Sequence, residues 1–173
     1  MIVVKDKQGD QYSTLDWEDL IARLNSYDGA DLVFDKNMSH RISNQHQTLE
    51  FVVREIDIFL KTMLGDADIT TILMAAFTHL QHSEHQGWAS WRKSDDQLNS
   101  SWEYRLLYSV PMLDSDKKPD PNYIYTLVTT VTLSADISTK SEWWKLCKTT
   151  TQNFSVAVNA VELIVEKVFV NPN

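Results

Sequence analysis

The sequence is poor in cysteine, glycine and proline, and it lacks a long apolar run. Its single cysteine, Cys147, excludes an internal disulfide and a zinc site built from several cysteines. With four glycines, the chain has no glycine-rich loop that would cradle a phosphate. No apolar run approaches the ~20 residues of a membrane-spanning helix. The first residues show no basic region followed by a long apolar stretch, so no secretory signal is visible.

Basic residues are also in deficit. Sixteen Lys and Arg against 24 Asp and Glu give a net charge of −8 and a pI near 5.0. This balance argues against a nucleic-acid partner and against electrostatic attraction to anionic lipid. It leaves open membrane binding through apolar and aromatic groups. The 173 residues, 43% apolar and 23% charged, indicate one globular domain over residues 1–173.

The N-terminal part predicts a strand, a helix and a second strand. Residues 1–5 alternate weakly and indicate a short strand. A helix is expected to follow, with Ser13 or Thr14 as its cap and Asp16 in its first turn. Ala30–Phe34 is expected to be another short strand. The apolar face of this helix recurs at i, i+3, i+4 and i+7 and consists of Trp17, Leu20, Ile21 and Leu24.

Two amphipathic helices are predicted next, over Leu49–Leu64 and Asp68–Gln81. The helical period is unbroken in both, and Gly65 stands where a helix often ends. A connection of about four residues favours an antiparallel helical hairpin. Because each helix has one apolar stripe, the pair must pack on another layer. The expected core residues of the whole chain are Val53, Ile56, Leu60, Ile72, Phe77, Leu106 and Leu127.

After Gly87 the period changes to two, which indicates a sheet. Trp102–Val110 alternates, a turn-rich segment follows, and Tyr123–Ala135 forms a long β-branched and aromatic run. Further strand material is expected at Trp143–Cys147, Phe154–Val158 and Val161–Val170, the last being compatible with a helix as well. Helices segregated from a run of long, mainly antiparallel strands predict an α+β layered fold.

No arrangement of residues recommends catalysis. His79, His82 and His85 lie three residues apart, which misses the i, i+4 spacing of helical metal-binding histidines, so a polar helix end is expected there. No Gly-x-Ser-x-Gly elbow is present. Cys147 has lysines nearby that would favour its thiolate, but without a visible histidine partner a buried structural thiol is expected. The sequence therefore predicts a non-enzyme without cofactor or metal.

Tryptophan is abundant, with six in the chain. Trp88, Trp91 and Trp102 are close in sequence, and Trp143 and Trp144 are adjacent. Neighbouring residues of a strand face opposite sides, so one of that adjacent pair is expected to be exposed. Exposed Trp and Tyr suit a membrane interface, while the alternative is that these rings fill the core between helices and sheet.

Several segments resemble the Cyt family of cytolytic δ-endotoxins. The similar segments are Phe59–Gly65, which closes a helix, then Ala76–Leu80, Trp88–Lys93 and Phe154–Asn159, in the family's order and spacing. The resemblance covers roughly residues 45–170 and implies a three-layer α/β/α domain: a sheet of long strands wrapped by helices. Fungal volvatoxin and an Erwinia virulence factor are similar in fold. This chain departs from the toxins because a single helix near residues 14–26 replaces a helical hairpin.

The resemblance implies a soluble protein, released or secreted by a non-classical route, that binds a target membrane, oligomerises there and permeabilises it. The alternatives are a non-lytic lipid- or acyl-chain-binding protein and an interaction domain of the same fold. Because the virulence factor is associated with a fatty acyl group on a cysteine, Cys147 is a candidate for acylation. If the long strands insert, lipid should meet alternate residues of Tyr123–Ala135: either Tyr123, Tyr125, Leu127, Val131 and Leu133, or Ile124, Val128 and Thr130. The aromatic candidates for lipid contact are Trp88, Trp91, Trp102, Trp143 and Trp144.

Overall fold

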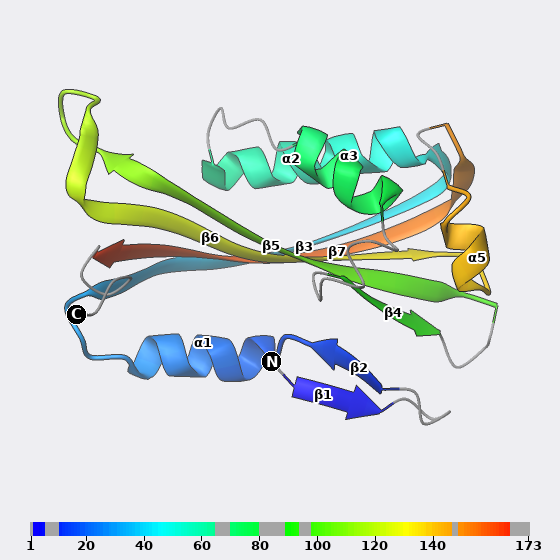
Figure 1. The fold of residues 1–173 in the computed structure, drawn as a ribbon, viewed down its shortest axis with the longest axis horizontal. Helices are drawn as coiled ribbons and strands as arrows, with labels where there is room; N and C mark the ends of the chain where they lie inside the picture. Colours follow the sequence, from blue (N-terminus) through cyan, green and yellow to red (C-terminus); the bar gives the residue numbers. More distant parts are fainter. Residues whose placement is uncertain are drawn as a thin grey trace.

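In the computed structural model, a five-stranded antiparallel sheet lies between two layers of other elements (Figure 1). The structure describes residues 2–5, 11–64, 70–79, 89–93, 98–146 and 149–166. The strand order in the large sheet is β3-β7-β6-β5-β4, and β1 and β2 form a separate two-stranded sheet. In chain order the elements are β1 (Ile2–Lys5), β2 (Gln11–Thr14), α1 (Trp17–Ser26), β3 (Leu32–Thr48), α2 (Leu49–Leu64), α3 (Thr70–Thr78), β4 (Ala89–Lys93), β5 (Ser100–Leu113), β6 (Pro119–Ala135), α5 (Lys140–Trp143) and β7 (Thr151–Glu166).

The helices α2 and α3 cover one face of the sheet, which we call the hairpin face, and α1 lies on the opposite face, the α1 face (Figure 1). The predicted α+β fold with long antiparallel strands, and its three-layer arrangement, are confirmed. The helix Leu49–Leu64 has the predicted bounds, because its apolar stripe is continuous: five of its residues are fully buried, and Phe59 and Met63 are partly buried. The Thr48 hydroxyl accepts a hydrogen bond from the Phe51 N–H (3.2 Å), which caps the helix directly after β3.

The core of the hairpin face joins α2 and α3 to the central strands. Among the predicted core residues, five are buried, namely Val53, Ile56, Leu60, Phe77 and Leu127, and Leu106 is partly buried against them. Ile72 was assigned wrongly, because its side chain is 46% exposed. It lies about 100° around α3 from Leu73, and Leu73 and Phe77 are the residues that point to the sheet.

Three strand predictions need correction. Of the expected short strand Ala30–Phe34, only Leu32–Phe34 is in a strand, as the start of β3, which pairs with β7 along Leu32–Thr48 with bulges after Phe34 and Asn44. Its second half is largely polar because β3 is the edge of the sheet, where backbone pairing on one side suffices. The segments Phe154–Val158 and Val161–Val170 belong to one strand, β7, as far as Glu166; residues 167–170 lie outside the described residues.

One predicted helix cap and one predicted strand were also wrong. Ser13 and Thr14 belong to β2, and Asp16 caps α1 by accepting a hydrogen bond from the Asp19 N–H. The expected strand at Trp143–Cys147 is also wrong: Trp143 ends the short helix α5 and Trp144 is its C-cap, while Cys147 lies outside the described residues. A capping box between Thr139 and Glu142 begins α5, and this Thr-x-x-Glu signal was present in the sequence.

Candidate functional site

The candidate site is the contact between the α2–α3 hairpin and the hairpin face of β5, β6 and β7. Five α2 side chains with no exposed surface fill it from above. From the sheet, alternate residues of each strand meet them. The fully or nearly fully buried members include Leu49, Val52, Val53, Ile56 and Leu60 from α2, Leu73 and Phe77 from α3, Trp102 from β5, Leu127, Val131 and Leu133 from β6, and Phe154, Val156 and Val158 from β7.

A small apolar cavity lies in this packing, beside the C-terminal half of α2. It has a volume of about 40 Å³ and is lined mainly by Leu60, Ile72, Leu106 and Leu127. The buried Thr129 hydroxyl also lines it and has no hydrogen-bond partner among the described residues. This volume is far below the ~300–1,000 Å³ of pockets that hold small molecules, so this cavity cannot hold an acyl chain without rearrangement.

The two alternative sets of lipid-contact candidates on β6 lie on opposite faces of the sheet. Leu127, Val131 and Leu133 are buried beneath the hairpin. On the same face, the Tyr125 hydroxyl donates a hydrogen bond to the buried Glu162 carboxylate (2.8 Å). The same hydroxyl oxygen lies 3.3 Å from the Met63 carbonyl oxygen. Tyr123 is 36% exposed in the N-terminal part of β6.

The opposite set faces α1. Val128 packs in a second apolar cluster with Val161, Leu163 and Val165 of β7 and with the predicted apolar face of α1. Thr130 is buried and accepts a hydrogen bond from the Trp17 indole N–H (2.9 Å). Ile124 pairs with Val165 in the register of β6 and β7.

Most of the described tryptophans are packed beside α5 instead of lying free on the surface. Trp102 and Trp143 are buried, and Trp91 is partly buried. The Trp143 indole N–H donates to the Ser100 hydroxyl (2.7 Å), and Lys140 Nζ lies 5.3 Å from the Trp91 ring centroid. Trp144 is 46% exposed, so one of the adjacent pair is exposed as expected, although on a helix C-cap and not on a strand. Trp88 lies outside the described residues.

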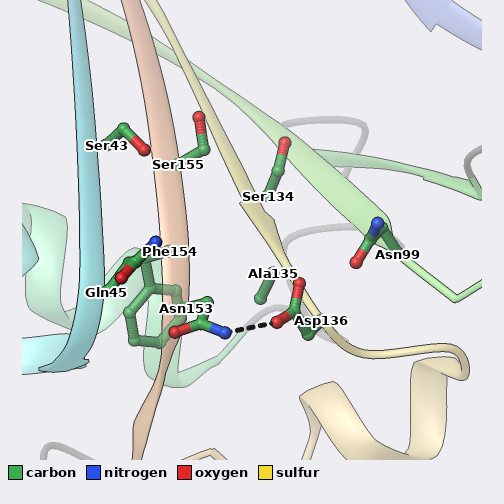
Figure 2. A pocket seen from close by; sticks show the side chains of 9 residues that line it. All are labelled: Ser43, Gln45, Asn99, Ser134, Ala135, Asp136, Asn153, Phe154 and Ser155. Atoms are coloured by element: carbon green, nitrogen blue, oxygen red, sulfur yellow. Dashed lines mark hydrogen bonds between the residues drawn. The ribbon is translucent and has the colours of Figure 1, made fainter.

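A polar groove of about 380 Å³ lies at the α5 end of the sheet, on the α1 face (Figure 2). Sequence reasoning missed it, because strand pairing assembles it from residues far apart in the chain. Its lining comes from β3, β6, β7 and the segments next to them: Ser43, Gln45, Asn99, Ser134, Ala135, Asp136, Asn153, Phe154 and Ser155. Asn153 donates a hydrogen bond to Asp136 (2.6 Å) across the groove.

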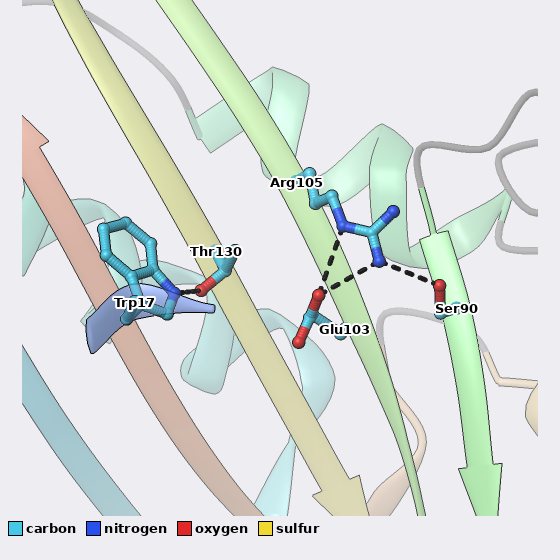
Figure 3. A network of polar contacts seen from close by, with 5 residues as sticks. All are labelled: Trp17, Ser90, Glu103, Arg105 and Thr130. Carbon is cyan, nitrogen blue, oxygen red and sulfur yellow. Dashed lines mark hydrogen bonds and ion pairs between the residues drawn. The ribbon is translucent and has the colours of Figure 1, made fainter. Parts of the chain in front are cut away.

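Elsewhere on the α1 face, β4, β5 and β6 carry a set of polar contacts (Figure 3). Arg105 forms an ion pair with Glu103 (3.1 Å) and donates to the Ser90 hydroxyl of β4 (3.0 Å). The Ser109 and Thr126 hydroxyls, also on these strands, lie 3.0 Å apart. The two faces of the same strands thus differ sharply, one apolar under α2 and α3, the other rich in hydroxyl groups.

Of the histidines and the cysteine considered from the sequence, the structure describes only one. His79 is exposed just after α3, whereas His82, His85 and Cys147 lie outside the described residues. Within the described ranges, no three His, Cys, Asp or Glu side chains are grouped to hold a metal ion. In the same ranges, no helix combines the length and the apolar character needed to cross a bilayer.

The fold is similar to that of solved toxin structures. No protein-family model and no curated protein matches the sequence. A δ-endotoxin structure superposes with a TM-score of 0.70 at 16% identity, covering 88% of this chain and 67% of that chain. The activated Cyt2Ba monomer from Bacillus thuringiensis subsp. israelensis gives a TM-score of 0.65, also at 16% identity, covering 87% of this chain and 79% of that chain. At this identity the likeness concerns the fold: the chain has the fold of the Cyt δ-endotoxins.

Proposed function

We propose that the protein permeabilises membranes without catalysis, by releasing the α2–α3 hairpin and inserting its long central strands into the bilayer. The observation that carries this proposal is the difference between the two faces of β5 and β6. Mainly apolar residues occupy the hairpin face, while the opposite face is mainly polar, with Leu107 and Val128 as apolar exceptions. Its polar residues are Ser101, Glu103, Arg105 and Ser109 on β5 and Thr126, Thr130, Thr132 and Ser134 on β6. Toxin names among the similar structures agree with this proposal.

The lengths of the strands support insertion. The strands β5, β6 and β7 have 14, 17 and 16 residues. A tilted strand needs about 9–11 residues to cross a bilayer, with apolar side chains toward lipid and polar side chains toward an aqueous lumen. The hairpin face would then meet lipid, and the residues in contact with it would be Tyr123, Tyr125, Leu127, Val131 and Leu133. Trp144, already exposed, is the described tryptophan best placed to contact a bilayer first.

Several copies would have to assemble. A barrel filled by its own side chains has about eight strands, and one with an open aqueous channel has about 16 or more. The large sheet of one chain has five strands. We therefore propose self-association on the membrane, with the 1–173 chain acting as one domain whose sheet joins β3 to β7.

The lipid most suited to this protein is neutral. The net charge of −8 opposes approach to anionic bilayers, and this repulsion decays over a Debye length of ~8 Å in physiological salt. Insertion would depend on apolar strand surface, which contributes about 25 cal/mol for each Å² removed from water. The acyl-carrier alternative is less well supported, because the cavity under the hairpin is about 40 Å³.

Dye release from phosphatidylcholine vesicles tests the proposal directly. We expect release at micromolar protein, and less release from vesicles that contain phosphatidylserine. Intact phosphatidylcholine vesicles at both acidic and neutral pH would refute the lytic function. Intact mass of the purified protein then tests the alternative, because bound lipid or an added acyl mass, with Cys147 as the candidate position, would favour a carrier.

Labelling at two exposed strand positions tests which face meets lipid. A single cysteine replaces Tyr123 on the hairpin face or Ser109 on the opposite face, each in a Cys147→Ser background, and carries a polarity-sensitive fluorophore. We expect vesicles to shift the emission of the Tyr123→Cys conjugate to the blue and to leave the Ser109→Cys conjugate in an aqueous environment. The reverse pattern would exclude the proposed orientation.

A further inference from the structure

The polar groove at the α5 end of the sheet contains a row of serines in cross-strand register (Figure 2). Ser43 of β3 pairs with Ser155 of β7, Ser155 with Ser134 of β6, and Ser134 with Ser101 of β5. Residues paired in this way share one face of the sheet, on strands about 4.8 Å apart. The first three serines line the groove, and none of their hydroxyls makes a hydrogen bond to another described residue. The result is a flat row of hydroxyl groups that are available to a ligand.

Asn153 fixes the rest of the groove. Its side-chain carbonyl accepts the His46 N–H (3.1 Å), and its amide donates to Asp136 Oδ2 (2.6 Å). The backbone of His46 has a positive φ of 51° beside a bulge in β3, so this hydrogen bond holds an irregular segment in place. Asn153 therefore positions Gln45 on one side and Asp136 on the other. With Oδ2 held by Asn153, Asp136 Oδ1 can accept from a ligand.

The chemistry of the lining selects the class of ligand. Seven of the nine lining side chains are polar, a single one is a carboxylate, and none is Lys or Arg. Arg41 lies two residues from Ser43 on the same face but is not part of the lining. Hydroxyl and amide side chains both donate and accept hydrogen bonds, and a carboxylate accepts from neighbouring hydroxyls. A ligand that matches this set is neutral and carries several hydroxyl groups. The groove volume of about 380 Å³ falls in the range of pockets for small molecules.

We propose that this groove binds a neutral sugar ring, either free or as the headgroup of a glycolipid. Ser43, Ser134 and Ser155 would contact successive ring hydroxyls, Asp136 would accept from one of them through Oδ1, and Gln45 and Asn99 would lie at the rim. Phe154 is buried and offers no aromatic platform for stacking, so affinity depends on hydrogen bonds that compete with water. We expect dissociation constants in the range of about 1–10 mM for single sugars. This site is independent of the proposed lytic function.

Side-chain amides in the groove provide a direct readout. In ¹H–¹⁵N spectra, methyl glycosides of glucose, galactose and mannose are titrated to about 50 mM, well above the expected dissociation constants. We expect shifts of the Gln45, Asn99 and Asn153 side-chain signals. Asp136→Asn should weaken binding about tenfold, because a neutral amide replaces the charged acceptor, and Ser43→Ala/Ser155→Ala should weaken it several-fold.

A matched control is available on the same face. Ser39 and Ser109 are also exposed strand serines but lie outside the groove, so Ser39→Ala/Ser109→Ala should bind as the parent does. Thermal unfolding of each variant checks that the fold is retained. No shift with any glycoside or with hexosylceramide vesicles would overturn the proposal, as would shifts that survive both Asp136→Asn and the Ser43/Ser155 variant.

Two further experiments are needed. One distinguishes a free sugar from a glycolipid headgroup, and the other tests whether the groove binds an anion instead. If free glycosides are inactive but phosphatidylcholine vesicles with a neutral hexosylceramide bind better than plain ones, in a manner lost in Asp136→Asn, the ligand is a glycolipid headgroup. If both bind, the ring alone suffices. Inorganic phosphate shifting the same amides at lower concentration than any sugar would overturn the proposal in favour of an anion near Arg41. Dye release is measured separately, so a failure of lysis leaves this result interpretable.

Discussion

The two faces of the sheet are covered to very different degrees. On the hairpin face, α2 buries five apolar side chains with no exposed surface, whereas α1 on the other face has no buried residue and meets a cluster of three buried β7 residues. Apart from the buried Glu162 and Thr129, the hairpin face is mainly apolar along β5, β6 and β7, and it needs a complete cover in water. The α1 face of β5 and β6 carries its own polar groups and needs less. The layer that would have to move for membrane insertion is therefore the better-packed one, and lipid must replace the contacts that it loses.

We expect the largest loss of stability from truncating a buried side chain between the α2–α3 hairpin and the sheet. Leu60→Ala should lower the free energy of unfolding by about 2–5 kcal/mol, because it removes a fully buried side chain. Leu20→Ala on α1 should cost about 1–2 kcal/mol, because Leu20 is only partly buried. Urea unfolding monitored by circular dichroism measures both.

Ile58→Ala is the matched control on α2, since Ile58 is 54% exposed and should change stability by less than about 0.5 kcal/mol. An equal loss for Leu60→Ala and Leu20→Ala would contradict the unequal packing of the two faces.

A smaller effect is expected beside α5. Trp143→Phe removes the buried hydrogen bond to Ser100 and should cost about 1–2 kcal/mol. Trp144→Phe, at an exposed position, should be close to neutral. Thermal denaturation of the two variants compares them, and similar losses would mean that the adjacent tryptophans were assigned to the wrong roles.

Beside the cavity under the hairpin, we expect a substitution that does not lower the free energy of unfolding. Thr129→Val replaces a buried hydroxyl without a described partner by a methyl group of similar shape, next to an apolar cavity. We expect unfolding free energy to be unchanged or raised by up to about 1 kcal/mol. Thr130→Val, on the opposite face, loses the hydrogen bond from Trp17 and should be destabilising. A clear loss in Thr129→Val would show that its hydroxyl is hydrogen-bonded.

The smallest effect concerns the capping box of α5. Hydrogen bonds from the Thr139 side chain and backbone, and then from Ser138, lower the pKa of Glu142 from its usual 4.5. A carboxyl whose folded pKa is depressed stabilises the fold above the unfolded pKa, and this stabilisation is lost as the pH falls through the folded value. Glu142→Gln should therefore lose stability relative to the parent near neutral pH, and the difference should shrink below pH 4.5. Chemical unfolding at several pH values checks this sign.

The sequence predicts best what a single periodic segment determines. The bounds of α2, the alternation along β5 and the core position of Leu60 follow from apolar spacing in one stretch of chain. The second half of β3 was not predictable in this way, because an edge strand held by backbone pairing needs few apolar residues. The prediction that Ile72 is buried was wrong for another reason. The apolar residues of α3 cover more than one face of the helix, so tertiary packing decides which of them point to the sheet.

The groove shows the limit of sequence reasoning most clearly. Ser43, Ser134 and Ser155 are far apart in the chain, and each is unremarkable within its own strand. They become neighbours only through the register that joins β3, β7 and β6. Likewise, the contact between Trp17 and Thr130 joins residues 113 positions apart. Functional sites built across strands leave no local pattern to read.

Tying the hairpin to the sheet tests the central claim most directly. In a Cys147→Ser background, cysteines at His40 of β3 and Phe59 of α2, whose rings stack with centroids 4.8 Å apart, can be joined by a short reducible crosslinker. The control joins Ser109→Cys and Thr126→Cys, cross-strand partners that stay together if β5 and β6 insert as a unit. Our account predicts that the His40–Phe59 bridge abolishes dye release from phosphatidylcholine vesicles, that reduction restores it, and that the control bridge has no effect. Dye release at the untethered rate with the His40–Phe59 bridge intact would contradict the account.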